Sequence, residues 1–174
     1  MEWLEDLVDY LTEHDIKLAT AESCTAGLIA SELARVPGSG QVIDSGLAVY
    51  SPEAKNRYLG IPFETISRYG LTGEEITREM VLGTLNNSNA KLAIANTGIA
   101  GPGEPDDGPP KGTVCLGWGF RYEDKIYVIT TTEHFDGDRN EVRLAAAHHA
   151  LKRVCDWHRD IRDGKLAPYW REHD

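Results

Sequence analysis

The sequence predicts an α/β fold, a three-layer α/β/α sandwich with a mixed sheet. Short apolar runs typical of buried strands alternate with segments whose apolar residues recur at helical spacing. Two β-rich runs, 114–120 and 126–132, flank a short polar turn and indicate an antiparallel hairpin. The chain has 174 residues, 41% of them hydrophobic, which is enough for one substantial core. We therefore expect a single domain.

Each element has its own signal in the sequence. In order, we expect a helix over 3–11, a strand over 16–21, a helix around 28–33, a strand over 42–50 interrupted by Gly46, helices over 52–60 and 72–85, a strand over 91–96, the hairpin, and a last long helix over 138–154. Ser51 and Pro52 suit an N-cap and a first helical turn. Capping-box spacing relates Thr72 to Glu75 and Asp138 to Glu141. Four residues are expected on one side of the last helix: Leu144, Ala147, Leu151 and Val154.

Composition and charge exclude several classes of function. The formal net charge of -10 repels phosphate backbones, so we expect no nucleic-acid partner. No apolar run reaches membrane-spanning length, and the acidic start of the chain is unlike a signal peptide. The three cysteines, Cys24, Cys115 and Cys155, show no metal-ligand spacing. We expect a cytoplasmic protein without membrane partners.

Ser23 lies where the first strand leads into the next helix, a place that favours negative charge. A serine there has three possible roles: an N-cap, which is the commonest, an anion binder or a nucleophile. Cys24 is a rival nucleophile. His134, His148, His149 and His158 mark no known triad pattern. Lys55 is a possible base if desolvation or a neighbouring positive charge makes it neutral, and otherwise an ordinary solvated lysine.

Glycine, proline and acidic residues dominate the segment 97–112, which we expect to be a long functional loop. Its start, Gly98 to Gly103, follows a strand and suits contacts between backbone amides and an anion. The spacing is neither that of a Walker loop nor that of a dinucleotide fingerprint. Arg139, at the start of the last helix, suits phosphate binding or an ordinary carboxylate contact.

Five of these segments occur together in the order and approximate spacing of one known family. They are Ala21-Glu22-Ser23-Cys24-Thr25, Tyr50-Ser51 with Glu53-Ala54-Lys55, Thr97-Gly98-Ile99-Ala100-Gly101-Pro102, Gly112-Thr113-Val114 and Gly137-Asp138-Arg139. The chain resembles the C-terminal domain of the competence-damage-inducible protein CinA. The first and third segments are specific to that family. The resemblance covers 1–158, and we expect 159–174 to be a charged extension of the same domain.

The resemblance implies an amidohydrolase that converts nicotinamide mononucleotide to nicotinate mononucleotide and ammonia, without a metal or cofactor. It implies Ser23 as nucleophile, Lys55 as base and Tyr50 as a group that moves protons or orients the lysine. Amides at the start of the helix after Ser23, or in the Gly98–Gly103 loop, are expected to hold the oxyanion. The implied substrate-binding residues are Thr25, Gly98, Ile99, Ala100, Gly101 and Arg139.

Ala26 departs from the family, which usually has glycine there, and its methyl group is expected to crowd the substrate or narrow the oxyanion site. Pro52 replaces the usual asparagine and is expected to stiffen the helix start. Two alternatives stay open, namely a non-catalytic nucleotide-binding or regulatory module with the same fold, and a hydrolase that uses Cys24. A homo-oligomer is compatible with so small a domain, but the sequence identifies no interface.

Overall fold

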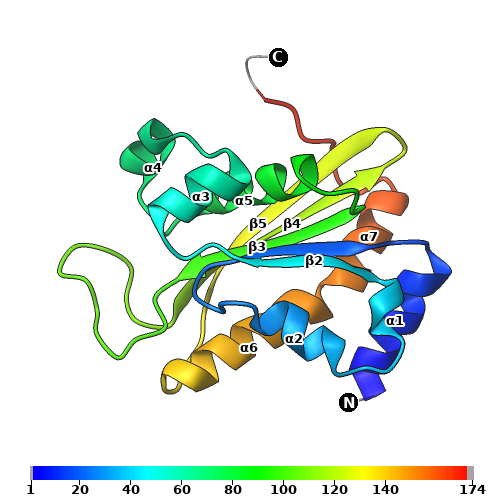
Figure 1. Cartoon of the computed structure of the whole chain (residues 1–174), viewed down its shortest axis with the longest axis horizontal. Coiled ribbons are helices and arrows are strands. Elements are labelled where there is room, and N and C mark those ends of the chain that lie inside the picture. Colours follow the sequence, from blue (N-terminus) through cyan, green and yellow to red (C-terminus); the bar gives the residue numbers. More distant parts are fainter. Residues whose placement is uncertain (1, 172–174) are drawn as a thin grey trace.

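The computed structural model describes residues 2–171, and its centre is one mixed sheet of five strands (Figure 1). The strands are β1 (Leu18–Glu22), β2 (Ile43–Ala48), β3 (Leu92–Gly98), β4 (Thr113–Tyr122) and β5 (Lys125–His134), in the spatial order β2-β1-β3-β4-β5. β1 pairs in parallel with β2 and β3, whereas β3–β4 and β4–β5 are antiparallel. This confirms the predicted mixed sheet and its hairpin.

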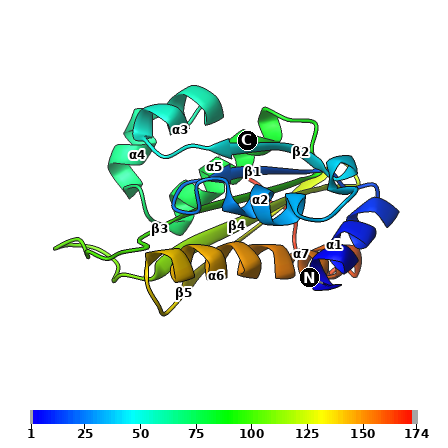
Figure 2. The ribbon, with the colours of Figure 1, turned by 60° about the horizontal axis from the view of Figure 1, so that its bottom comes forward.

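Helices cover both faces of the sheet, as Figure 2 shows. One face carries α3 (Pro52–Leu59), α4 (Phe63–Tyr69) and α5 (Glu74–Asn86), and the other carries α1 (Glu2–Glu13), α2 (Leu28–Ala34), α6 (Arg139–Lys152) and α7 (Val154–Arg162). A short 3-10 turn, Ser39–Gln41, follows α2. Two hydrophobic cores fill the spaces between the layers. β1 is buried along its whole length, as expected for a strand covered on both faces. The three-layer α/β/α prediction is therefore confirmed.

Two helix ends follow the predicted caps and one does not. Ser51 Oγ accepts a hydrogen bond from the Ala54 amide at 3.0 Å, and Asp138 and Glu141 form a complete capping box. The capping box predicted at Thr72 is wrong. α5 begins at Glu74 after an N-cap at Gly73 that offers no side chain.

The region after α3 also differs from the prediction. α4 was not expected, because its seven residues bury only Ile66 and carry no apolar stripe. Gly46 does not interrupt β2. A Cβ atom at this glycine would lie 2.9 Å from the Ala30 Cβ, so its absence lets α2 pack close to the sheet.

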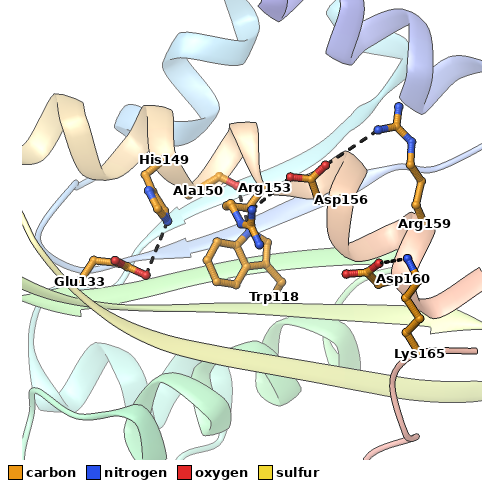
Figure 3. Close-up of polar contacts among 9 residues, drawn as sticks. All are labelled: Trp118, Glu133, His149, Ala150, Arg153, Asp156, Arg159, Asp160 and Lys165. Carbon is orange, nitrogen blue, oxygen red and sulfur yellow. Dashed lines mark hydrogen bonds and ion pairs between the residues drawn. The ribbon is translucent and has the colours of Figure 1, made fainter.

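The predicted last helix is two helices, α6 and α7, separated at Arg153. Trp118 of β4 donates from its indole Nε1 to the Ala150 carbonyl at 2.9 Å, just before the break (Figure 3). That carbonyl is the acceptor that a continuous helix would use for the Val154 amide, so the sheet competes with the helical ladder here. Leu144 is 39% exposed, contrary to the prediction that it lies with the buried Ala147 and Leu151.

The described part of the segment after 158 contacts the sheet and α5 at two places. α7 runs through the expected boundary to Arg162. Further on, the Tyr169 amide donates to the Ile126 carbonyl of β5 at 2.7 Å, and Arg171 pairs with Glu79 of α5 at 3.1 Å. Residues 172–174 of the expected extension lie outside the described residues. Across residues 2–171, no helix combines the length and apolar character needed to cross a membrane.

Candidate active site

Three parallel strands bring the candidate residues to one edge of the sheet. Ser23 follows the carboxyl end of β1, Lys55 lies on α3 after β2, and the glycine-rich loop follows β3. The Ser23 amide donates to the Asn96 carbonyl of β3 at 3.1 Å, so the chain is still held to its neighbouring strand at this position. The carboxyl ends of parallel strands are where α/β proteins generally bind ligands.

Ser23 and Lys55 form a buried pair. Lys55 Nζ lies 3.2 Å from Ser23 Oγ, and the two residues are 1% and 9% exposed. The amine also donates to the carbonyls of Val49 at 2.7 Å and Tyr50 at 3.1 Å. Burial removes water from the ammonium group and thereby lowers the pKa of Lys55. The lysine is therefore held as a potential base.

The three oxygen atoms around Lys55 Nζ also suit its neutral form. A neutral amine has two N–H groups and one lone pair, and two of its three neighbours are carbonyls that only accept. With both N–H groups directed to Val49 and Tyr50, the lone pair is left for the Ser23 hydroxyl. The arrangement can therefore accept the serine proton without moving the lysine.

Cys24 lies beside Ser23 but is poorly suited to be the nucleophile. Its Sγ donates to Asn96 Oδ1 at 3.4 Å, and the residue is buried. Burial raises the pKa of the Cys24 thiol to about 12. A thiol with that pKa stays protonated at neutral pH and is a weak nucleophile. The geometry favours Ser23 over its neighbour.

Glu22, which sequence reasoning missed, holds the turn that carries Ser23. Its carboxylate is fully buried and accepts hydrogen bonds from the hydroxyls of Thr20 at 2.9 Å and Thr25 at 2.6 Å. It also accepts from the Ile29 amide at 2.8 Å and the Ala30 amide at 3.3 Å. A carboxylate at a helix N-terminus is stabilised by the free amides there. The only signal in the sequence was an acidic residue directly after an apolar run.

The amides of α2 are therefore not free to hold an oxyanion, contrary to one of the two expected arrangements. Glu22 occupies those of Ile29 and Ala30, while the Leu28 amide donates to Thr25 and the Ser31 amide to Gly27. Ser23 does not lie on the helix itself either, because α2 begins only at Leu28.

Ala26 takes a backbone conformation that suits glycine. Its φ is 50° and that of Gly27 is 97°, so both residues are left-handed. The alanine is exposed and is not among the described residues that line the cleft below. A non-glycine residue in this region costs about 1–2 kcal/mol. The usual glycine here therefore serves the backbone conformation of the turn.

Arg139 and Tyr50 contact one another through their side chains. Arg139 donates from Nη1 to the Gly101 carbonyl at 2.6 Å and from Nη2 to the Tyr50 hydroxyl at 2.9 Å. Tyr50 therefore contacts Lys55 through its carbonyl, while its phenol, in a side chain 54% exposed, contacts the arginine. Thr25 directs its hydroxyl inward to Glu22 and receives a hydrogen bond from Asn96.

A cleft of about 230 Å³ lies beside these residues. It is lined by Cys24, Tyr50, Gly98, Ile99, Ala100, Gly101, Gly103 and Arg139. A Cβ at Gly98 would lie 2.6 Å from the Thr113 carbonyl, so only glycine fits this approach of β3 to β4. The structure thus brings the expected loop and Arg139 to the same cleft as Tyr50.

Three of the histidines weighed in the sequence make contacts with other partners. His148 pairs with Glu32 at 2.7 Å, His149 with Glu133 at 3.7 Å (Figure 3), and His158 with the Tyr10 hydroxyl at 2.8 Å. Within residues 2–171, no cluster of three or more acidic, histidine or cysteine side chains is arranged to hold a metal ion.

Comparison with known proteins identifies the family. A family model described as the CinA C-terminal domain matches residues 2–157. The chain belongs to this family. A CinA-like protein of Akkermansia muciniphila is 40% identical over 152 residues, which are 86% of this chain and 36% of the relative. A putative competence-damage inducible protein of Caldicellulosiruptor saccharolyticus is 39% identical over 147 residues, 84% and 35% of the two chains.

Solved CinA-family structures match over nearly their whole length. The competence damage-inducible protein A (ComA) of Klebsiella pneumoniae has a TM-score of 0.83 at 33% identity, covering 89% of this chain and 94% of that one. CihA of Agrobacterium tumefaciens has a TM-score of 0.82 at 34% identity, covering 90% and 94%. By contrast, this chain spans little more than a third of the length of the curated CinA relatives above.

Proposed function

We propose that this chain is an amidohydrolase that deamidates nicotinamide mononucleotide to nicotinate mononucleotide and ammonia. The observation that carries the proposal is the contact of 3.2 Å between Lys55 Nζ and Ser23 Oγ, in a setting that lowers the pKa of the lysine. Membership of the CinA C-terminal domain family supports the choice of substrate.

The first half of the reaction acylates the enzyme. Neutral Lys55 takes the proton of the Ser23 hydroxyl while Oγ attacks the carboxamide carbon of the substrate. The ammonium that forms on Lys55 is stabilised by the carbonyls of Val49 and Tyr50. It then gives its proton to the amide nitrogen, the C–N bond breaks, and ammonia leaves an acyl group on Ser23.

The second half regenerates the enzyme. A water molecule takes the place of ammonia, and Lys55, neutral again, removes its proton as the water oxygen attacks the acyl carbon. The bond to Ser23 Oγ breaks, and the serine recovers its proton from Lys55. The products are nicotinate mononucleotide and the free serine. This cycle uses a single base for both steps.

Two backbone amides next to the nucleophile are the natural oxyanion donors. Among the described residues, the N–H groups of Cys24 and Thr25 have no backbone acceptor, although both residues are at most 4% exposed. Buried amides without a partner are rare, so such groups are suited to a ligand atom. The amide that follows a nucleophile has this role in other hydrolases.

Arg139 suits the phosphate end of the nucleotide. It lies at the first position of α6, and its planar guanidinium suits an anion. It also borders the cleft formed by the loop after β3. This local positive charge would attract an anionic substrate despite the net charge of -10.

The proposal is tested by measuring ammonia release from nicotinamide mononucleotide, nicotinamide riboside and free nicotinamide. We expect release from the mononucleotide, its loss in Ser23→Ala and its retention in Cys24→Ala. Tight nucleotide binding without ammonia from any substrate would instead indicate a non-catalytic binding module. Loss of activity in Cys24→Ala alone would overturn the assignment of Ser23.

A further inference from the structure

Arg143, one helical turn after Arg139 on α6, contacts the backbone of the nucleophile turn. It donates from Nε to the Cys24 carbonyl and from Nη2 to the Thr25 carbonyl, both at 3.0 Å. A third bond, from Nη1 to Asn140 Oδ1 at 3.2 Å, holds the guanidinium against its own helix. One planar side chain thus holds two consecutive peptide units, Cys24–Thr25 and Thr25–Ala26.

One of these contacts acts directly on a peptide unit whose N–H has no backbone acceptor among the described residues. The Cys24 carbonyl and the Thr25 N–H belong to one peptide unit, so a cation bonded to the oxygen makes the N–H a stronger donor. The preceding unit is reached through a relay. Arg143 bonds to the Thr25 carbonyl, and the Ala26 N–H of that unit donates to the Ser23 carbonyl at 3.1 Å, while the Cys24 N–H has no backbone acceptor in residues 2–171. Both units are thereby fixed in orientation by their oxygen atoms.

We propose that Arg143 is a positioning residue for the hydrolysis. It holds and polarises the peptide unit of the Thr25 amide directly, and that of the Cys24 amide through Ala26, so that both amides can stabilise the oxyanion. This inference rests on the proposed function. It separates the two arginines of α6, because Arg139 faces the cleft and Arg143 faces the turn. Arg139 should therefore govern substrate binding, measured as KM, and Arg143 should govern turnover, measured as kcat.

The test compares Arg143→Lys and Arg143→Gln with Arg121→Lys. Lysine keeps the charge but not the planar fork that reaches two carbonyls. Arg121 is the matched control, since its Nη2 donates to the Leu85 carbonyl at 2.9 Å, away from the site. Two readouts are used, namely kcat and KM for nicotinamide mononucleotide, and the rate at which a fluorophosphonate labels Ser23 by intact mass. Thermal melting establishes that each variant is folded.

Removal of an oxyanion donor costs about a hundredfold in turnover, and we expect about tenfold for the loss of a group that acts through such donors. Both Arg143 variants should lower kcat and the labelling rate by that factor with little change in KM, and Arg121→Lys should change neither. Folded Arg143 variants with unchanged kcat, or with raised KM alone, would overturn the inference. A wild-type protein that is neither labelled nor active would instead refute the proposed function.

Discussion

Lys55 lies in an environment that few lysines occupy, and its ionisation should govern activity. Because its pKa is lowered by burial and the neutral form is the proposed base, kcat/KM should rise with pH through that pKa and then level off. Lys55→Arg should abolish activity at every pH, since arginine stays charged. A pH–rate profile of the wild type and of Lys55→Arg tests both expectations. Lys91→Arg, at an exposed lysine, is the control. Full activity in Lys55→Arg would exclude the lysine as base.

The sequence pointed to the residues of the candidate site, but not to the contacts between them. Ser23, Lys55, Tyr50 and Arg139 were singled out from motifs, and the structure brings them to one edge of the sheet. The contact between the Tyr50 phenol and Arg139 depends on two segments 89 residues apart, so local patterns carry no trace of it. The same applies to the bonds from Arg143 of α6 to the turn after Ser23.

At the scale of elements, α2 depends on a carboxylate from the strand before it. Two hydroxyls and two backbone amides now donate to the two carboxylate oxygens of Glu22. Glu22→Gln replaces one of these oxygens with an NH₂ group, which cannot accept, and leaves the other uncharged. We expect a loss of about 1–3 kcal/mol in the free energy of unfolding, the cost of an unsatisfied buried group. Chemical denaturation measures it, and the exposed Glu13→Gln is the control. Equal stability of the two variants would contradict this role.

Element boundaries were predictable where a helix supplies its own cap and not where another element intervenes. Ser51 and Asp138 cap their helices with local hydrogen bonds, so their sequences suffice. The break between α6 and α7 coincides with a bond from Trp118 of the sheet, about which the helical sequence says nothing. α4 is short and mostly exposed, and therefore lacks the apolar periodicity that marks a helix.

At the scale of the whole molecule, His158 joins α7 to α1 and β4 at the end of the sheet. It is 6% exposed, bonds to Tyr10 on α1 and stacks on Phe120 of β4 at 6.0 Å between ring centroids. Burial, followed by the charges of His14, Arg162 and Arg159, lowers its pKa from 6.5 to about 4. Protonation of this one ring therefore opposes the packing of three elements.

The sign of the effect follows from proton binding. Between pH 6.5 and about 4 the unfolded chain binds a proton that native His158 does not, so stability should fall as the pH falls through this range. The loss is on the order of 3 kcal/mol, since one pKa unit corresponds to about 1.4 kcal/mol. Unfolding measured at several pH values should show a weaker dependence in His158→Gln than in His149→Gln. Identical curves would show that His158 does not contribute.

The fold class was predictable because alternation of helices and buried strands needs only local patterns. The strand order β2-β1-β3-β4-β5 was not, since it depends on which strands pair across the crossovers. β2 is an edge strand with alternating exposure, whereas its apolar run resembles that of a central strand. Which strand lies at the edge of the sheet and which at its centre is decided by packing across the whole domain.

The placement of Ser23 and Lys55 after neighbouring parallel strands has a consequence for folding kinetics. β1 and β2 pair only after the chain has crossed over through α2. The other edge of β1 is paired only when β3 has been added. Such non-local parallel pairing is slow to form compared with helices and hairpins. Recovery of the proposed hydrolysis after dilution from denaturant should therefore lag behind recovery of the helical signal, and its rate would report when the parallel strands have paired.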